Sequence, residues 1–336
     1  MSAARVRVPA TSANLGPAFD CAGLALSRHD VLEFAVQPSG LAVEVSGVGA
    51  GELPADESHL VVRAFRAACA ELGWSPPGLR VVAENAIPQG RGMGSSAAAV
   101  VAGVLGAWAL CPEVEDIDLD AVLRLTSELE GHPDNVAPAV LGGFTIAYTD
   151  GQGPAGFHAV RLDVDPALCF VVLVPEVALE TKVARGLLPS QVPHRDAARN
   201  AGRSALLVAA LTGRPDQLMA ATEDRLHQQY RAGVLGASSE LLRALRDAGV
   251  PATVSGAGPT VLVLAGPGHR AARDAVLADL VDETAGWRRL SPGIDLTGAR
   301  ARRIAGNTGA LSSGPSGADR SHAGPGSPAV RGGSMQ

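Results

Sequence analysis

The sequence has 336 residues, of which 46% are hydrophobic and 18% charged, and its formal net charge is −6. This length and composition support one large core or two moderate ones and exclude a wholly disordered chain. The mild acidic excess provides no broad basic field that would attract nucleic acid. No uninterrupted apolar stretch reaches the roughly 20 residues of a membrane span, and the N-terminus lacks the pattern of a signal peptide. We therefore expect a cytoplasmic protein that binds neither nucleic acid nor a membrane.

The cysteine and lysine content excludes several further classes of protein. No Cys-x-x-Cys pair is present, and a chain of this size does not need disulfides. We therefore expect reduced thiols at Cys21, Cys69, Cys111 and Cys169. Lys182, in ETKVAR, is the only lysine. A Walker A loop needs a lysine before serine or threonine and a protein kinase needs one on a strand, so both of these ATP-binding designs are excluded.

In the first half of the chain, the spacing of apolar residues predicts alternating strands and helices. Strands are expected at 5–9, 31–36, 79–82 and 142–148, and helices at 60–72, 95–110 and 120–130. Helix 95–110 is rich in alanine and has small residues on most faces, which favours tight packing on all sides. Gly131 and Pro133 are expected to end the helix before them.

The second half continues the alternation and then changes in composition. Strands are expected at 169–174, 252–255 and 260–264, and helices at 197–211, 238–247 and 270–281. This order predicts an α/β or α+β protein with two lobes. No linker marks the boundary, and we divide the chain into lobes at 1–160 and 161–303. Residues 304–336 are dominated by glycine, serine, proline and alanine, which predicts a disordered tail.

The strongest local signal is the segment IPQGRGMGSSAAA, residues 87–99. Its glycines let the backbone approach an anion closely, and Ser95 and Ser96 stand where the next helix needs caps for its first N–H groups. The helix dipole favours a phosphate there, and a serine hydroxyl can reach a phosphate-bound cation. An ordinary glycine-rich turn with serine caps is the alternative. The G-x-G-x-G spacing differs from the dinucleotide-binding fingerprint.

Two more loops have unusual residues. VPATSANLGPAFDCAGLAL, residues 8–26, places Asn14 and Asp20 among prolines and glycines directly after a strand. Taken alone, such residues are turn formers. SGAGPTVLVL, residues 255–264, is a glycine turn between two strands and would by itself predict a hairpin.

Together these three segments resemble, in order and approximate spacing, the three motifs of the GHMP kinase superfamily. ATSANLGPAFD, residues 10–20, and EGHPDNVAPAVLGGF, residues 130–144, are similar to the homoserine kinase family within it. The resemblance covers roughly residues 5–300. It implies an α+β fold in which an N-terminal lobe with a left-handed-crossover type of sheet and a ferredoxin-like C-terminal lobe flank the active site. It also implies a homodimeric enzyme of threonine biosynthesis that uses ATP and Mg²⁺ to phosphorylate the side-chain hydroxyl of L-homoserine.

The resemblance further implies the roles of individual residues. ATP would bind Pro88, Gln89, Gly90, Arg91, Gly92, Met93, Gly94, Ser95, Ser96 and Ala97. Mg²⁺ would bind Ser96 and Glu130, with Glu128 as the rival ligand. Homoserine would bind Asn14, Asp20, His132, Asp134, Asn135, Thr181, Arg185, Arg231 and Gly256. Of these, Arg185 and Arg231 would hold its carboxylate, because a guanidinium presents paired donors to two oxygens. The catalytic set would be Asp134, Glu130, Ser96 and Arg185.

Several alternatives stay open at this point. Asp134 would either remove the proton of the hydroxyl or only orient it, and the lack of a lysine near the first motif argues against a Lys–Asp base. Ala18 replaces a family glycine, which matters only if residue 18 needs a positive φ. His59 stands where the family tends to have asparagine, which leaves the adenine contacts open. The alternative functions are another small-molecule kinase of the superfamily and a nucleotide-binding regulator without turnover.

Overall fold

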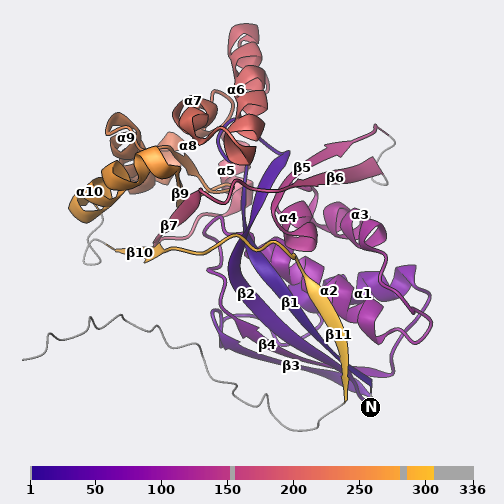
Figure 1. Ribbon diagram of the computed structural model, residues 1–336. Coiled ribbons are helices and arrows are strands. Elements are labelled where there is room, and N and C mark those ends of the chain that lie inside the picture. The colour runs from indigo at the N-terminus through magenta and orange to yellow at the C-terminus, as the bar shows by residue number, and fades with distance from the viewer. Residues whose placement is uncertain (1, 152–155, 281–285, 306–336) are drawn as a thin grey trace, which may run out of the picture. The chain divides into compact units, whose positions relative to one another are not determined.

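A seven-stranded sheet forms the frame of the N-terminal half of the chain (Figure 1). The structure, a computed structural model, describes residues 2–151, 156–280 and 286–305. The strands of this sheet are β1 (Ser2–Ala13), β2 (Ala22–Val36), β3 (Gly40–Gly47), β4 (Gly78–Asn85), β5 (Phe144–Thr149), β6 (Phe157–Leu162) and β11 (Arg300–Ala305). Their order is β11-β1-β2-β4-β3, with β5 paired to β2 and β6 to β5. Among the strands that the structure describes in this sheet, β3 and β4 are the one parallel pair.

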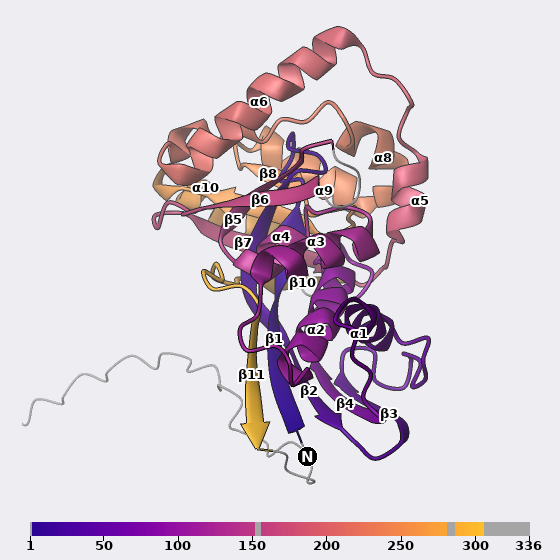
Figure 2. The same cartoon turned by 90° about the vertical axis from the view of Figure 1, so that its right-hand side faces the viewer.

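The described residues of this half form four helices, and α2 is the central one. They are α1 (Leu60–Glu71), α2 (Ser95–Leu110), α3 (Leu119–Glu130) and α4 (Val136–Leu141). A Cβ at Gly103 would lie 2.3 Å from the carbonyl oxygen of Val61 in α1, and one at Gly106 would lie 2.8 Å from the Phe34 ring in β2. The small residues of α2 thus let it pack closely between α1 and the sheet (Figure 2), as its composition predicts.

The second sheet has four antiparallel strands. They are β7 (Cys169–Pro175), β8 (Ala252–Val254), β9 (Val261–Ala265) and β10 (Trp287–Leu290), in the order β10-β7-β9-β8. Between β7 and β8 come α5 (Thr181–Gly186), α6 (His194–Thr212), α7 (Leu218–Ala221), α8 (Gln228–Leu235) and α9 (Ala237–Asp247), while α10 (Arg270–Leu280) joins β9 to β10. In chain order, the last strand of this sheet, β10, lies beside the first, β7. The third strand, β9, lies between β7 and the second strand, β8. This is the expected ferredoxin-like arrangement, and the α+β prediction is confirmed.

Strand β7 is shared by two hydrophobic cores. Phe170, Val172 and Val174 point into the large core that also contains α2 and the first sheet. Val171 and Leu173 point the other way, into a smaller core with residues of α9 and β9. Successive side chains of a strand alternate between its faces, so an apolar run of this kind is what two-sided burial requires.

The sequence located the long elements better than the short ones. The predicted helices 60–72, 95–110, 120–130, 197–211 and 238–247 correspond to α1, α2, α3, α6 and α9 within a few residues. Several short or exposed elements were not predicted: β3, β6, β10, β11, α4, α5, α7 and α8. Strand β11 returns from the end of the C-terminal half and pairs with β1. The division at residue 160 falls inside β6.

The predicted tail at 304–336 needs one correction. Ile304 and Ala305 are the last residues of β11, so the expectation of disorder is wrong for these two. Their backbone pairs with β1, which a composition argument alone does not detect. The rest of that segment lies outside the described residues.

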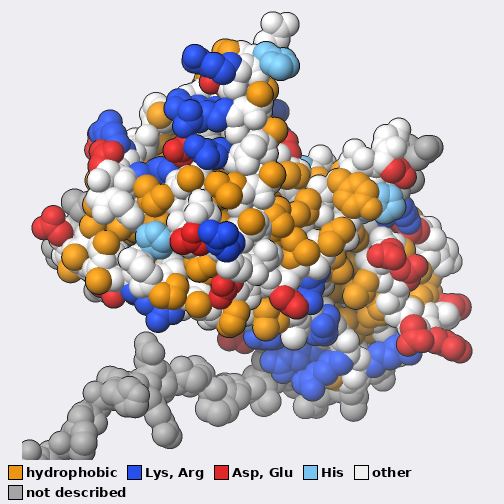
Figure 3. All heavy atoms as spheres, turned by 45° about the horizontal axis from the view of Figure 1, so that its top comes forward, with side chains coloured by type: hydrophobic (Ala, Val, Ile, Leu, Met, Phe, Trp, Pro, Cys, Tyr) orange, Lys and Arg blue, Asp and Glu red, His pale blue; other side chains and the backbone are white. Residues whose placement is uncertain are grey.

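The surface of the C-terminal half carries a group of arginines on one helix. On the face in Figure 3, basic side chains gather over α6, where Arg195, Arg199 and Arg203 lie, with acidic and apolar side chains among and beside them. Among the described residues, no helix is long and apolar enough to cross a bilayer. The four cysteines are free thiols, as expected.

Candidate active site

The glycine-rich loop leads into the N-terminus of α2 without a side-chain cap. Gly94 is the N-cap residue, with a φ of 69°, and no side chain bonds to the first turn. The prediction that serines cap this helix is therefore wrong. Ser96 instead donates its hydroxyl hydrogen to Glu130 Oε2 at 2.9 Å. The first amides of a helix have no intrahelical acceptor, so those of α2 are available to an anion, which the helix dipole also favours.

The three sequence motifs meet at this loop. A Cβ at Gly92 would lie 2.2 Å from the carbonyl oxygen of Ser255, and one at Gly94 would lie 1.9 Å from Thr11 Oγ1. The Ser255 hydroxyl contacts the Gly92 carbonyl oxygen at 2.6 Å and the Ser12 hydroxyl at 2.8 Å. The glycines are thus required by close packing against the other two motifs as well as by their positive φ values.

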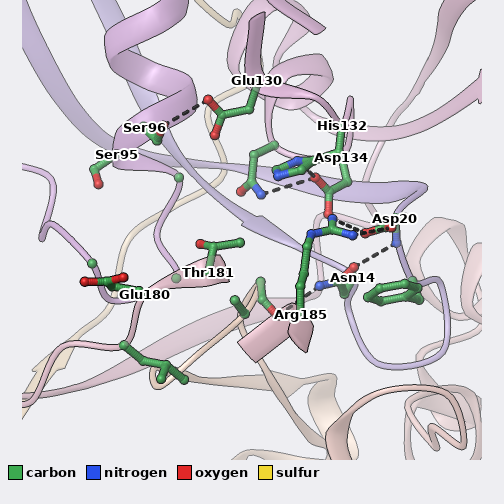
Figure 4. Close-up of a pocket in the computed structure, with 18 of the residues that line it drawn as sticks. Asn14, Asp20, Ser95, Ser96, Glu130, His132, Asp134, Glu180, Thr181 and Arg185 are labelled. Carbon is green, nitrogen blue, oxygen red and sulfur yellow. Dashed lines mark hydrogen bonds and ion pairs between the residues drawn. The ribbon is translucent and has the colours of Figure 1, made fainter. Parts of the chain in front are cut away.

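A cavity of about 140 Å³ opens beside the loop and contains most of the predicted site residues. Figure 4 shows Ser96 and Glu130 at one end, Asn14, Asp20 and Arg185 at the other, and His132 and Asp134 between them. Its predicted lining residues are Asn14, Asp20, Gly90, Gly92, Gly94, Ser95, Ser96, Glu130, His132, Asp134, Asn135, Thr181, Arg185, Arg231 and Gly256. Residues that are distant in the sequence therefore form one site.

Two arginines and an aspartate occupy one end of this cavity. Arg185, on α5, forms two hydrogen bonds with Asp20, of 2.9 and 2.6 Å, through NH1 and NH2. Arg231, on α8, is only 1% exposed. The two guanidinium groups lie over the ring of Phe19, with their Cζ atoms 5.6 Å and 5.4 Å from its centre. Asp20 is ion-paired with Arg185, whereas no carboxylate among the described residues lies within ion-pair distance of Arg231, so the Arg231 guanidinium is suited to a ligand carboxylate.

The loop between β1 and β2 has an unusual backbone. Asn14 and Asp20 have φ values of 69° and 57°. The Asn14 side chain holds the loop, since its Oδ1 accepts from the Asp20 amide and its Nδ2 donates to the Gly256 carbonyl. Asparagine and aspartate tolerate left-handed backbone better than other residues with a Cβ. Ala18 is not among the residues with positive φ, so its methyl group causes no backbone strain.

The middle of the cavity is a small electrostatic network. The Asp134 side chain is 4% exposed, and its Oδ1 lies 2.9 Å from His132 Nδ1. Although burial favours the neutral ring, the hydrogen bond and charge of Asp134 raise the pKa of His132 above its usual value. Burial raises the pKa of Glu130, and the hydrogen bond from Ser96 offsets part of that effect. The pKa of each group is therefore higher than in an exposed side chain of the same type.

The two rival glutamates face different surroundings. Glu130 lines the cavity, whereas Glu128 forms an ion pair of 3.2 Å with Arg124 one helical turn away. Among the described residues no group of three or more His, Cys, Asp or Glu side chains could hold a metal ion. A cation here would need ligands from Ser96, Glu130, water and phosphate oxygens together.

A second cavity of about 310 Å³ adjoins the first and shares Ser95 and Ser96 with it. Its walls are mostly apolar and include Leu32, Leu53, Pro54, Leu60, Val61 and Ala99. His59 is the N-cap of α1, and its Nδ1 accepts from the Val61 amide. Its Nε2 is buried and has no hydrogen-bond partner within the described residues. The neutral ring thus keeps an unpaired Nε2–H donor buried in the wall of this cavity.

Four residues predicted to bind ATP lie elsewhere. Pro88 and Arg91 line a different groove, and the Arg91 guanidinium donates to the carbonyl oxygens of Gln89, Pro175 and Glu176. Met93 and Ala97 are completely buried in the core. Gln89 lines the second cavity. The sequence reasoning missed Phe19, Leu179, Glu180 and Ala257 in the first cavity and Asp30, Leu53, Pro54 and Ser58 in the second. Phe19 was detectable, since it lies within the first motif.

Comparisons with known proteins agree with this geometry. Residues 59–143 match the family of GHMP kinase N-terminal domains, and residues 204–282 match the family of GHMP kinase C-terminal domains. A relative described as a homoserine kinase in Clavibacter michiganensis is 51% identical over 299 residues, which are 88% of this chain and 92% of the relative. Another, from Streptomyces coelicolor, is 50% identical over 301 residues, or 89% and 94% of the two chains.

The solved structure of a homoserine kinase from Cytophaga hutchinsonii is also similar. It superposes with a TM-score of 0.75 at 25% identity and covers 89% of this chain and 97% of its own. The fold, the two adjoining cavities and the matched domains define a member of the GHMP kinase superfamily. Within that superfamily, identity of about half over most of the chain places this protein in the homoserine kinase family.

Proposed function

We propose that this protein transfers the terminal phosphoryl group of ATP to the side-chain hydroxyl of L-homoserine, a step of threonine biosynthesis. The observation that carries the proposal is the meeting of two cavities at Ser95 and Ser96. The second cavity is apolar enough to bind a nucleobase, and the first cavity contains charged side chains that can bind a zwitterion. The phosphates would then lie over the α2 N-terminus, between base and acceptor, which allows in-line transfer.

The nucleotide would be held chiefly by backbone amides and by one side-chain hydrogen-bond donor that has no other partner. We place the phosphates on Gly90, Gly92 and Gly94 and on the first amides of α2. The base would occupy the second cavity, beside His59, whose Nε2–H has no partner among the described residues. Ser96 and Glu130 fit a magnesium ion, since an alcohol and a carboxylate oxygen are hard ligands that share one hydrogen bond. When bound, Mg²⁺ neutralises charge on the transferring phosphate.

The acceptor end selects a molecule that has both charges. Asp20 and Arg185 bond to each other. An ammonium group can replace Arg185 as the partner of Asp20, and a carboxylate can replace Asp20 as the partner of Arg185. A zwitterion that separates this pair leaves both side chains paired, whereas a ligand with one charge that separates it leaves one of them unpaired. Since an unpaired, partly buried charge is costly, the site favours an amino acid.

The hydroxyl group would lie near Asp134. Asp134 Oδ1 is already bonded to His132, which leaves Oδ2 to accept a hydrogen bond from the hydroxyl. Lys182 lies on α5 and is not among the residues that line the cavity. The site therefore contains no Lys–Asp pair, and we propose that the main tasks of the protein are positioning and charge stabilisation.

An acceptor panel tests the proposed function. In a coupled assay with Mg-ATP, we expect rapid turnover of L-homoserine and at least a hundredfold lower kcat/KM for 3-aminopropan-1-ol and 4-hydroxybutyrate, each of which lacks one charge. L-Serine, L-threonine and mevalonate complete the panel. Faster turnover of another acceptor would favour another small-molecule kinase. ATP binding without turnover of any acceptor would favour the regulator without catalysis.

The raised pKa of Glu130 predicts a pH-dependent affinity for magnesium. Burial favours the protonated acid, so the carboxylate that the metal needs is lost as the pH falls through a value above the usual 4.5. Metal binding should release a proton in this range and weaken at lower pH. Calorimetry of Mg-ADP binding in buffers of different ionisation enthalpy measures this release. Glu128→Gln should retain it, because Glu128 pairs with Arg124, whereas an unchanged release in Glu130→Gln would contradict the assignment.

Three further expectations stay proposals. We infer a homodimer and a cytoplasmic location, and we place the boundary between the two lobes near residue 160, after β6. Size-exclusion chromatography with light scattering tests the dimer directly.

A further inference from the structure

His227 is a completely buried histidine at the N-cap of α8, outside the predicted catalytic set. Its ring stacks on Phe19, with ring centres 5.2 Å apart. Phe19 lines the acceptor cavity and lies under both guanidinium groups of the site. His227 therefore lies directly behind the acceptor site.

The two hydrogen bonds of the ring fix its chemical form. Nε2 lies 2.8 Å from the Gly16 carbonyl oxygen, which can only accept, so Nε2 must have the hydrogen. Nδ1 lies 3.1 Å from Arg231 NH1, which can only donate, so Nδ1 must be unprotonated. The ring is therefore neutral, and burial, the largest effect, lowers the pKa of His227. Asp224 and Asp20 act in the opposite direction, while the charge of Arg231 acts with burial.

The same contact determines how Arg231 faces the cavity. Its Nε donates to the Ala184 carbonyl oxygen of α5 at 3.1 Å, and its NH1 donates to His227. NH2 has no hydrogen-bond partner within the described residues. The guanidinium is thus held through Nε and NH1, which leaves NH2 and the second NH1 hydrogen to donate to a carboxylate in the cavity.

The other contact holds the loop between β1 and β2. Gly16 belongs to the same turn as Asn14 and Asp20, and three of its residues that are not glycine have positive φ. The adjacent Pro17 carbonyl oxygen accepts from Asn200 and Ser204 of α6. Helices α6 and α8 therefore hold this strained turn through two successive carbonyl groups.

We propose that His227 is a positioning residue that sets the distance between the ammonium and carboxylate ends of the acceptor site. One ring nitrogen holds the turn that contains Asn14 and Asp20, and the other orients Arg231. The inference rests on the proposed function, since it assigns the acceptor as a zwitterion held between these two groups.

Two substitutions separate the two contacts. In His227→Gln the amide N–H can reach the Gly16 carbonyl as Nε2 does, but the acceptor for Arg231 is lost. In His227→Asn the amide oxygen can accept from Arg231 in place of Nδ1, but the donor to Gly16 is lost. For His227→Gln we expect a tenfold to hundredfold rise in the KM for homoserine, because a hydrogen bond to a charged group is removed. The KM for ATP should change less than twofold.

Competitive inhibition by analogues that have only one of the two charges of homoserine shows whether the ammonium end or the carboxylate end of the acceptor site is affected. We expect His227→Gln to weaken inhibition by 4-hydroxybutyrate and to leave inhibition by 3-aminopropan-1-ol unchanged, with the reverse order for His227→Asn. His29→Gln is the matched control. His29 also bridges an arginine and a second residue, Arg7 and Asp295, but lines neither cavity. The His29→Gln substitution should lower the melting temperature of the protein without changing the KM for homoserine or the KM for ATP.

Failure of the positioning role of His227 can be distinguished from failure of the proposed function. If the wild-type protein does not phosphorylate homoserine, the proposed function fails. If it does, and His227→Gln leaves the homoserine KM within twofold or raises both KM values equally, the positioning role is wrong. Should neither variant fold, ¹⁵N spectra of the wild-type imidazoles decide the matter. A charged ring or an Nδ1–H tautomer at His227 would overturn the inference, and the neutral Nε2–H form would support it.

Discussion

Replacing Arg231 by methionine is expected to raise the KM for homoserine by about a thousandfold, because a buried charged hydrogen-bond donor to a carboxylate is worth several kcal/mol. Arg231 is 1% exposed, so a side chain of similar length without charge preserves most of its packing. The KM for ATP should stay within about twofold, since Arg231 lines only the acceptor cavity. Steady-state kinetics with each substrate varied in turn measures both values.

Two further variants make this test specific. Arg231→Lys retains the charge but loses the paired donors, and we expect an intermediate effect of about thirtyfold on the same KM. Arg243→Met is the control, because Arg243 is exposed on α9 and lines neither cavity. A wild-type KM for homoserine in a folded Arg231→Met protein would show that this arginine does not hold the carboxylate.

Replacing Glu130 by glutamine is expected to lower kcat by two to three orders of magnitude while ATP still binds, since a metal ligand is lost and the backbone phosphate site is not. Glutamine keeps the shape of the side chain and can still accept the hydrogen bond from Ser96. The magnesium concentration needed for half-maximal rate should rise in parallel. Rapid-quench measurement of phosphoryl transfer, with magnesium varied, separates this loss from slow product release.

Glu128→Gln is the paired control for that experiment. It removes a carboxylate two residues away on the same helix, and this carboxylate is paired with Arg124. We expect a small loss of stability, below about 1 kcal/mol for a partly exposed ion pair, and an unchanged kcat. Equal losses of kcat in the two variants would mean that the charge of this helix end, and not a ligand at residue 130, supports the reaction.

The sequence predicted the long elements well because their patterns are local. Helix α2 has an uninterrupted run of small and apolar residues and starts after a glycine, and its predicted and observed bounds are the same. Helix α3 ends at Gly131, whose left-handed conformation is the usual end of a helix. Strand β11 was not predicted, because its alternation of arginine with small residues is weak and its pairing with β1 comes from the far end of the chain.

The candidate site was predictable to the extent that motifs contain it. Asn14, Glu130, Asp134 and Arg231 all line the cavity that the resemblance implies. The predicted role of the serines as helix caps was wrong. A hydroxyl next to a helix start suggests a cap, whereas the Ser96 hydroxyl bonds to Glu130 across the cavity. Which of the two glutamates faces that cavity depends on the rotation of α3, and sequence spacing alone does not determine it.

By itself, then, the sequence determined the type of fold, the helix that follows the glycine-rich loop and the family, because apolar periodicity, glycine position and motif order are properties of short segments. Only the tertiary structure decided how the segments combine. It paired Asp20 with Arg185 across 165 positions of sequence, and it placed His227 between Gly16 and Arg231. Such contacts depend on the packing of α5, α6 and α8 around one turn, and no local pattern encodes a distance between elements so far apart in the chain.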